Sequence, residues 1–330
     1  LKGTFLVEGI GAVLFAFKFI PEYGVLTGIG YSIFHSVSAF CNAGIDIIGS
    51  TSFQQYALSP LINFTTMFLI VMGGLGFPVW HDIAANVRKI GKERKRPLKW
   101  LFTRLTLQSR IVIIMTASLI LFGTLCFFII EFENPATMKD MNVFQKIMAS
   151  MFQSVTTRTA GYATVSQAGL EESSKLIGCI LMFVGGSPAG TAGGIKTTTA
   201  AMLILTVLCV LRNRRDTECF DRKIATDSIK SGVTIALITF FVLFAGIMAL
   251  TVFEPGVDVL DLMYEAASAM GTVGLSADLT PNLTRASHIV LMLMMYIGRI
   301  GPLTMALVFA GKSDKSSQFR ELPEEKVMLG

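Results

Sequence analysis

Three short segments of the chain end in a glycine and could bind a cation through backbone carbonyls. They are Asn42-Ala43-Gly44, Thr159-Ala160-Gly161 and Thr272-Val273-Gly274. A turn that brings consecutive carbonyls round one axis needs backbone angles that glycine tolerates and residues with a Cβ atom rarely adopt. Carbonyls arranged in this way can replace the hydration shell of an ion. We predict that these nine residues form a filter that coordinates a permeating cation, without a structural metal.

A short helix precedes each of these segments, predicted over residues 31–41, 143–156 and 259–270. Such a helix is too short to cross a bilayer, which takes about 20 residues. Non-helical backbone at membrane depth is tolerated only where it is buried in protein or lines a water-filled cavity. A short helix that ends at such a turn also directs the negative end of its dipole toward the ion. We interpret the three as pore helices; ordinary re-entrant packing loops are the alternative that the sequence leaves open.

A glycine-rich stretch at 185–194 interrupts another apolar segment. A helix interior is destabilised by about 1 kcal/mol per glycine and about 3 kcal/mol per proline. Five glycines and one proline within ten residues therefore predict a break, which at membrane depth must face a cavity. We expect the break to obstruct the path below the filter and to act as a gate, built from Gly185, Gly186, Ser187, Pro188, Ala189, Gly190, Thr191, Ala192, Gly193, Gly194 and Lys196.

This stretch has two other interpretations. A phosphate-binding loop requires a glycine immediately before its lysine, whereas Ile195 precedes Lys196. Close packing of small residues against neighbouring helices is the second alternative. Nucleotide binding here would make the chain a membrane enzyme; we expect no enzyme.

Arg299 completes the predicted gate. It lies within the last apolar run, and an arginine at the centre of a membrane helix costs about 2.5–3.5 kcal/mol on insertion scales. We expect it to face the cavity below the filter, where it repels a cation or holds the glycine-rich loop by its carbonyls. A structural arginine bound to helix-end carbonyls is the alternative.

The elements that position these residues form a threefold repeat in an apolar chain. Of the 330 residues, 52% are hydrophobic and 15% charged, against roughly 25% charged in soluble domains. This predicts an all-α integral membrane protein of helix–pore-loop–helix units around a pseudo-fourfold cation pore. Each unit is expected to contain two apolar helices. They lie at 5–20 and 61–84 in the first unit, at 106–130 and 176–210 in the second, and at 224–253 and 287–310 in the third. The units are 1–95, 96–215 and 216–312, followed by a cytoplasmic tail, 313–330.

The distribution of charge predicts the orientation. The linkers 88–99 and 212–223 are basic, whereas the loops 131–135 and 254–258 are acidic. The positive-inside rule places the basic linkers in the cytoplasm and the protein, multi-pass, in the plasma membrane. Asp46 and Asp278 follow filter glycines and either concentrate cations at the outer mouth or are ordinary solvated carboxylates. We expect Arg158 to brace its filter loop.

These segments resemble the Ktr/Trk/HKT superfamily of potassium transporters, over essentially the whole chain. The stretches 38–44, 156–162 and 268–276 are similar to the second, third and fourth filter loops of that family, and 185–198 to the loop that interrupts a helix of its third repeat. The run 296–304 resembles the last membrane helix, and the tail 323–330 favours the Ktr branch. The family has four units, so the resemblance implies that the N-terminal unit is missing.

The resemblance implies potassium uptake by the pore subunit of a Ktr-type system. It further implies a homodimer in the lipid bilayer on a cytoplasmic, nucleotide-binding, KtrA-like regulatory ring, activated by ATP, with Na⁺ as a possible activator. No covalently bound cofactor and no nucleic acid are expected. In the family, glycine at all four filter positions accompanies potassium and serine in the first accompanies sodium. Gly44, Gly161 and Gly274 favour potassium, and the first position is absent.

Besides the membrane enzyme, a second rival function from a different class of protein remains. Broken helices also build midplane sites in secondary transporters of other solutes or of sodium. That function predicts inverted units without a re-entrant pore helix, whereas the three units here are repeated in the same direction.

Overall fold

The chain is mostly helical in the computed structural model, which describes residues 2–49, 51–92, 102–214 and 216–301. Three helices are long and apolar enough to cross a membrane: α1 (Lys2–Tyr23), α6 (Leu107–Ile130) and α10 (Thr226–Phe253). A bent pair of helices could supply a fourth span. The predicted tail, 313–330, lies outside the described residues.

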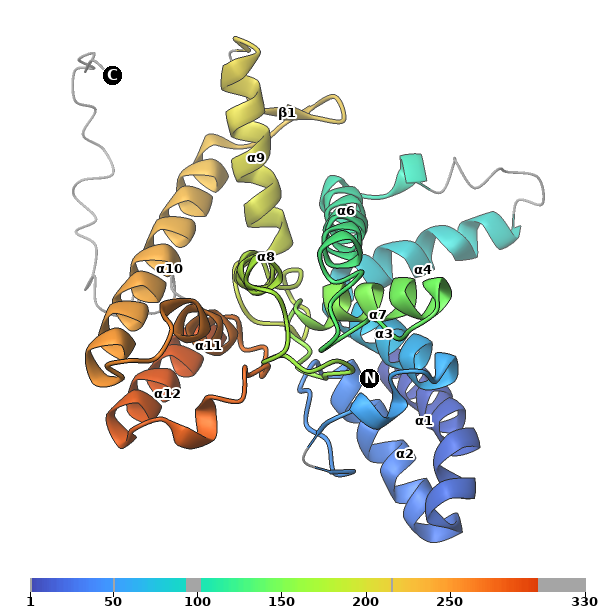
Figure 1. Cartoon of the computed structure of the whole chain (residues 1–330). Coiled ribbons are helices and arrows are strands. Elements are labelled where there is room, and N and C mark those ends of the chain that lie inside the picture. The colour runs from blue at the N-terminus through green and yellow to red at the C-terminus, as the bar shows by residue number, and fades with distance from the viewer. Residues whose placement is uncertain (1, 50, 93–101, 215, 302–330) are drawn as a thin grey trace.

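The helices follow one another in the predicted repeating order. After α1 come α2 (Val25–Phe40), α3 (Pro60–Gly74) and α4 (Phe77–Lys92). After α6 come α7 (Val143–Thr156), α8 (Glu172–Phe183) and α9 (Thr197–Leu211), and after α10 come α11 (Val259–Gly271) and α12 (Arg285–Ile300). Figure 1 shows the three groups side by side, the first in blue and the last in orange and red. The unit boundaries themselves stay a prediction.

The first short helix is longer than the sequence suggested. We predicted residues 31–41, but α2 begins at Val25. Gly28 and Gly30 resemble turn residues in the sequence, yet Gly28 lies where α2 crosses α1. A Cβ atom there would lie 2.6 Å from the Cα of Ile20. The glycine therefore permits a close helix crossing, and the chain stays helical through it.

The prediction of one continuous helix over 61–84 was wrong. The chain bends by 97° between α3 and α4. Gly76 adopts a left-handed φ of 86°, and Pro78, in the first turn of α4, lacks the N–H that a continuing helix would need. The carbonyls of Gly73 and Gly74 at the end of α3 bind the 185–194 loop instead. The run of three glycines and a proline, 73–78, was the signal that the prediction missed.

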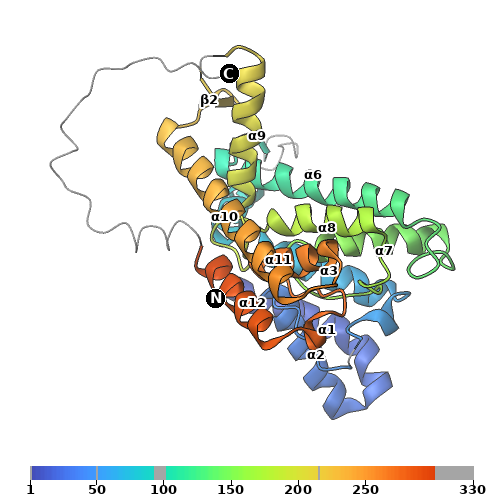
Figure 2. The ribbon, with the colours of Figure 1, turned by 60° about the vertical axis from the view of Figure 1, so that its left-hand side comes forward.

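The basic linker before α10 contains a small hairpin that an all-α description omits. Strands β1 (Glu218–Cys219) and β2 (Arg222–Lys223) pair antiparallel. Phe220 and Asp221 between them both have positive φ, which is the geometry of a type I′ turn. The hairpin lies beside the end of α9 in Figure 2.

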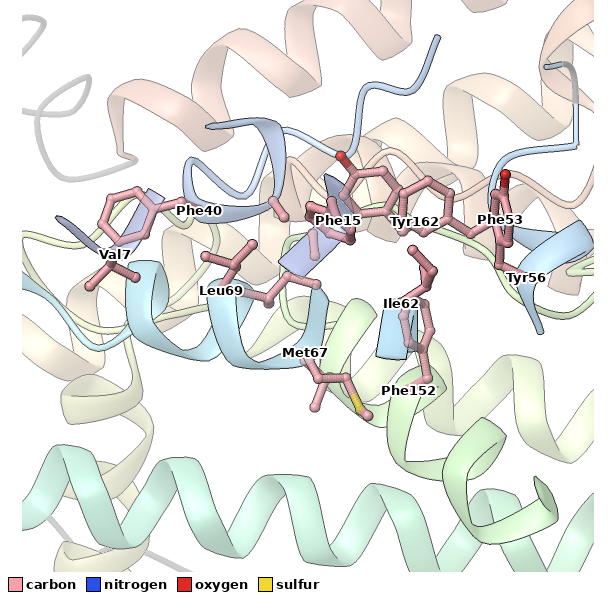
Figure 3. Close-up of a cluster of buried hydrophobic side chains, with 14 of the residues drawn as sticks. Val7, Phe15, Phe40, Phe53, Tyr56, Ile62, Met67, Leu69, Phe152 and Tyr162 are labelled. Carbon is pink, nitrogen blue, oxygen red and sulfur yellow. The ribbon is translucent and has the colours of Figure 1, made fainter. Parts of the chain in front are cut away.

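The buried core of the first group is aromatic and reaches the second group. Phe15, Phe53 and Tyr56 are buried together with Tyr162, which follows the second filter glycine (Figure 3). The rings of Phe53 and Tyr162 stack with centroids 4.5 Å apart. Stacked aromatic pairs contribute about 0.5–1.5 kcal/mol beyond their buried area. The core thus fixes two predicted filter loops relative to each other.

The outer faces of the long helices are apolar. On α10, Leu237, Phe240, Phe241 and Phe244 are all exposed. A continuous exposed apolar surface of this kind is rare on soluble proteins and marks a contact with lipid or with another chain. The fold is that of an all-α membrane protein with pore-loop helices.

Candidate ion filter and gate

The three predicted filter segments share one unusual backbone geometry. Two residues before each glycine, φ is positive: 51° at Asn42, 72° at Thr159 and 52° at Thr272. The glycines themselves have φ of 65° at Gly44, 90° at Gly161 and 93° at Gly274. Left-handed backbone is costly for residues with a Cβ atom, so its recurrence at equivalent positions marks a shared structural requirement. We call these segments the Gly44, Gly161 and Gly274 loops.

The three loops lie next to one another. A Cβ atom on Gly44 would lie 2.0 Å from the carbonyl oxygen of Ala160 and 2.8 Å from the Cα of Gly161. A Cβ atom on Gly161 would lie 2.2 Å from the carbonyl oxygen of Val273. Glycine is therefore required at these two positions for space as well as for φ, because the neighbouring backbone occupies the volume of a methyl group.

A cavity lies on the side where the chain leaves the loops. It has a volume of about 190 Å³ and is lined by all three glycines. Asp46 and Asp278 line it too. The two carboxylates thus lie where they can raise the local cation concentration.

A second cavity is lined by residues that precede the glycines. Its volume is about 450 Å³, and its wall includes Asn42, Ala43 and Thr272. Arg299, in the last turn of α12, lines the same cavity. The Gly44 and Gly274 loops therefore border both open spaces, of which one is lined by carboxylates and the other by a guanidinium.

The 185–194 loop separates α8 from α9, where the sequence predicted a break. Its backbone binds the bend of the first group: the N–H of Ser187 donates to the carbonyl of Gly74 at 3.0 Å, and that of Thr191 to Gly73 at 3.3 Å. In return, the N–H of Phe77 donates to the carbonyl of Ala189. The free carbonyls at the end of α3 are thus satisfied by the loop.

The same loop contacts the ends of the pore helices. The hydroxyl of Thr191 donates to the carbonyl of Phe40, the last residue of α2, at 3.2 Å. A Cβ atom on Gly193 would lie 2.1 Å from Oγ1 of Thr272, and one on Gly185 3.1 Å from Cγ2 of Thr159. The 185–194 loop therefore lies against the Gly161 and Gly274 loops and against the end of α2, just before the Gly44 loop.

Two basic side chains bind carbonyls of this loop. Arg299 donates from Nη1 to the carbonyl of Thr191 at 2.7 Å. Lys196, the N-cap residue of α9, donates from Nζ to the carbonyl of Ala192 at 2.7 Å. Both bonds are charge-assisted and hence among the stronger hydrogen bonds. Arg299 thus has both properties considered from the sequence, facing the cavity and binding the loop.

Arg158 lies behind the Gly161 loop, away from the two larger cavities. Its side chain is buried, and Nη2 donates to Oγ1 of Thr116 at 3.5 Å. A space of about 10 Å³ borders it together with Asn42 and Gly186. This position agrees with a bracing role, and the guanidinium lines neither of the two cavities that border the predicted filter.

Sequence reasoning missed several residues behind the loops. Glu265 is buried and accepts three hydrogen bonds from the segment that follows Gly274. The signal was present, because an acidic residue in an apolar helix is costly and marks a specific function. Tyr264 and Gln167 carried no comparable signal, since only the fold brings them together.

The model of the TrkH family, described as cation transport protein, matches residues 3–319. The chain is 34% identical to the Ktr system potassium uptake protein B of Bacillus subtilis, over 98% of this chain and 69% of that protein. It is also 34% identical to the potassium/sodium uptake protein NtpJ of Enterococcus hirae, over 100% of this chain and 70% of that protein.

Solved structures include the same fold. The potassium transporter TrkH of Vibrio parahaemolyticus superposes with a TM-score of 0.69 at 17% identity. The match covers 93% of this chain and 63% of TrkH. The chain therefore spans about two thirds of the length of the proteins that it matches.

Proposed function

This chain belongs to the TrkH family of cation transport proteins, and on that premise we propose that it forms the ion pathway of a Ktr-type potassium uptake system. It is a membrane transport protein and not an enzyme. The observation that carries the proposal is the meeting of three left-handed glycine loops at one cavity that carboxylates border, with a second cavity, lined by Arg299, beside two of the loops. Carbonyls so placed can substitute for the hydration shell of K⁺.

The nine residues of the three loops form the selectivity filter in this proposal. Gly44, Gly161 and Gly274 favour K⁺ over Na⁺ as the transported ion. The Enterococcus relative is named as a potassium/sodium uptake protein, which supports keeping Na⁺ as an activator or second cargo.

The 185–194 loop, Lys196 and Arg299 form the gate. The loop lies against the filter and binds the guanidinium, so a cation leaving the filter meets both. Opening requires the loop to withdraw and the bond between Arg299 and Thr191 to break. A nucleotide site in this loop is disfavoured, because the N–H groups of Ser187, Gly190 and Thr191 already donate to carbonyls.

The proposal also covers the arrangement of the units and the assembly of the subunits. The units 1–95, 96–215 and 216–312 surround one pseudo-fourfold pore in the plasma membrane, with the basic linkers in the cytoplasm. Two such subunits assemble on a cytoplasmic nucleotide-binding ring of the KtrA type. The rival function, a secondary transporter of another solute, lacks support, because three short helices that end at glycine loops repeat in one direction.

Potassium uptake by cells that lack their own uptake systems tests the proposal. The complete gene is expressed as wild type and with Gly161→Asp, which places a bulky charge where a Cβ atom already meets the Val273 carbonyl. We expect wild type to restore uptake and the variant to abolish it. If wild type moves no K⁺, or if the variant transports normally, a secondary transporter of another solute becomes the preferred function.

A further inference from the structure

The segment after Gly274 is held from behind by one carboxylate. Oε1 of Glu265 accepts from the hydroxyl of Ser276 at 2.5 Å and from the N–H of Ala277 at 3.0 Å, while Oε2 accepts from Thr280 at 2.7 Å. Glu265 is 4% exposed. Hydrogen bonds to a charged group are strong where water is excluded. These three bonds therefore hold the segment that follows the Gly274 loop in one position.

A pair of amides braces the segment after Gly161. Gln153 on α7 donates to Oε1 of Gln167 at 2.7 Å, and Gln167 donates back to Oε1 of Gln153 at 3.2 Å. Gln167 also donates to the carbonyl of Val165 at 2.8 Å. Both side chains are buried, so the pair is a specific contact in the interior.

Tyrosines join these braced loops to one another. Tyr264, next to Glu265 on α11, donates its hydroxyl to Oε1 of Gln167 at 2.7 Å. Tyr162, next to Gly161, donates its hydroxyl to the carbonyl of Ile45, next to Gly44, at 3.1 Å. Tyr162 and Tyr264 are both completely buried. One phenol therefore ties α11, the helix that leads into the Gly274 loop, to the segment that follows the Gly161 loop. The other ties the residues directly after the Gly161 and Gly44 loops to each other.

We propose that Tyr162 and Tyr264 are positioning residues that set the spacing of the filter loops and thereby the preference for K⁺ over Na⁺. The inference rests on the proposed function. Selectivity among alkali cations depends on how many carbonyls coordinate the ion and how they are arranged. Loops tied in series through buried hydroxyls resist rearrangement around a smaller ion, and loss of either tie relaxes that resistance.

The test is the ratio of K⁺ to Na⁺ uptake in the same cells, expressing the complete gene as wild type, Tyr162→Phe and Tyr264→Phe. Phenylalanine keeps the ring and removes only the hydroxyl. We expect each variant to lower the ratio about fivefold, which corresponds to about 1 kcal/mol. Because both fluxes pass through the same molecules, the ratio does not depend on how much protein reaches the membrane.

Tyr56→Phe is the matched control. Tyr56 is also buried and donates its hydroxyl to Oε2 of Glu22 at 2.6 Å, which lies on α1 and not in a filter loop. It should keep the wild-type ratio. Gln167→Met removes the acceptor of Tyr264 and provides a second route to the same loss should Tyr264→Phe abolish all transport.

The outcomes separate this inference from the proposed function. Suppose that wild type is selective for K⁺ and that the ratio of K⁺ to Na⁺ uptake is unchanged in Tyr162→Phe, Tyr264→Phe and Gln167→Met. This result would overturn the inference and leave the proposed function intact. Wild type that takes up no K⁺ would remove the proposed function itself. An equal fall of the ratio in Tyr56→Phe would show a general effect of lost buried hydroxyls, which also overturns the inference.

Discussion

Arg299 and Thr191 are joined by a 2.7 Å hydrogen bond although 108 residues separate them in the chain. The donor lies at the end of α12 and the acceptor in the 185–194 loop, so in the proposed gate the bond connects two parts that move apart when an ion passes. Arg299→Ala should shift the gate toward the open state by about 10- to 100-fold, because hydrogen bonds to charged groups contribute about 1.5–3 kcal/mol.

Potassium uptake without the regulatory partner measures this shift, and the variant should exceed wild type. Arg285→Ala is the matched control, since Arg285 is exposed at the opposite end of the same helix. Uptake by Arg299→Ala that equals wild type would mean that this bond does not hold the gate.

The filter glycines should differ in their tolerance of alanine. All three have positive φ, for which a residue with Cβ loses about 1–2 kcal/mol. Gly44 and Gly161 also meet a neighbouring carbonyl oxygen within 2.2 Å of a new Cβ atom, whereas at Gly274 the nearest atom is 3.9 Å away. We expect Gly44→Ala and Gly161→Ala to lose K⁺ uptake and Gly274→Ala to retain part of it. Equal losses at all three would show that φ alone decides.

Gly193→Ala should loosen the contact between the 185–194 loop and the filter. Its Cβ atom would lie 2.1 Å from Oγ1 of Thr272 and 3.0 Å from the carbonyl oxygen of Gly271, so the loop must move away. We expect a leak of K⁺ from preloaded cells. Gly9→Ala, in α1 with no atom within 4 Å of the new Cβ, is the control and should not leak. A Gly193→Ala variant that does not leak K⁺ would contradict the gate assignment.

Acid should destabilise the protein through Glu254, which lies just beyond α10. The hydroxyl of Ser287 and the N–H of Thr284 donate to Glu254, and these bonds lower its pKa below the ordinary 4.5. A carboxyl whose pKa is lower in the folded state stabilises the protein above the unfolded pKa and loses that effect as the pH falls through the folded pKa.

The melting temperature in detergent from about pH 6 to about pH 3 checks this sign. Glu254→Gln should melt lower than wild type at the higher pH and converge with it in acid. Glu133→Gln, at an exposed glutamate of another loop, should parallel wild type throughout. Curves for Glu254→Gln that stay parallel to wild type would disprove the linkage.

Local sequence determined the repeating elements and the positions where they break. Apolar length, the glycine at the end of each short helix and the glycine-rich stretch at 185–194 are properties of neighbouring residues, so they could be predicted without a fold. The bend at Gly76 also has a local cause, the glycines and proline of the run 73–78. The prediction of a continuous helix missed it because the surrounding residues are mostly apolar.

Tertiary structure decided which distant residues meet. Tyr264 and Gln167 are 97 residues apart and Tyr162 and Ile45 117 apart, and neither pair has a distinctive local pattern. Each side chain is an ordinary polar or aromatic residue until the packing of α11 against α8, and of Phe53 against Tyr162, brings it to its partner and removes water. A hydrogen bond of this kind depends on the relative position of two helices to within an ångström, which packing of the whole core fixes and sequence periodicity does not.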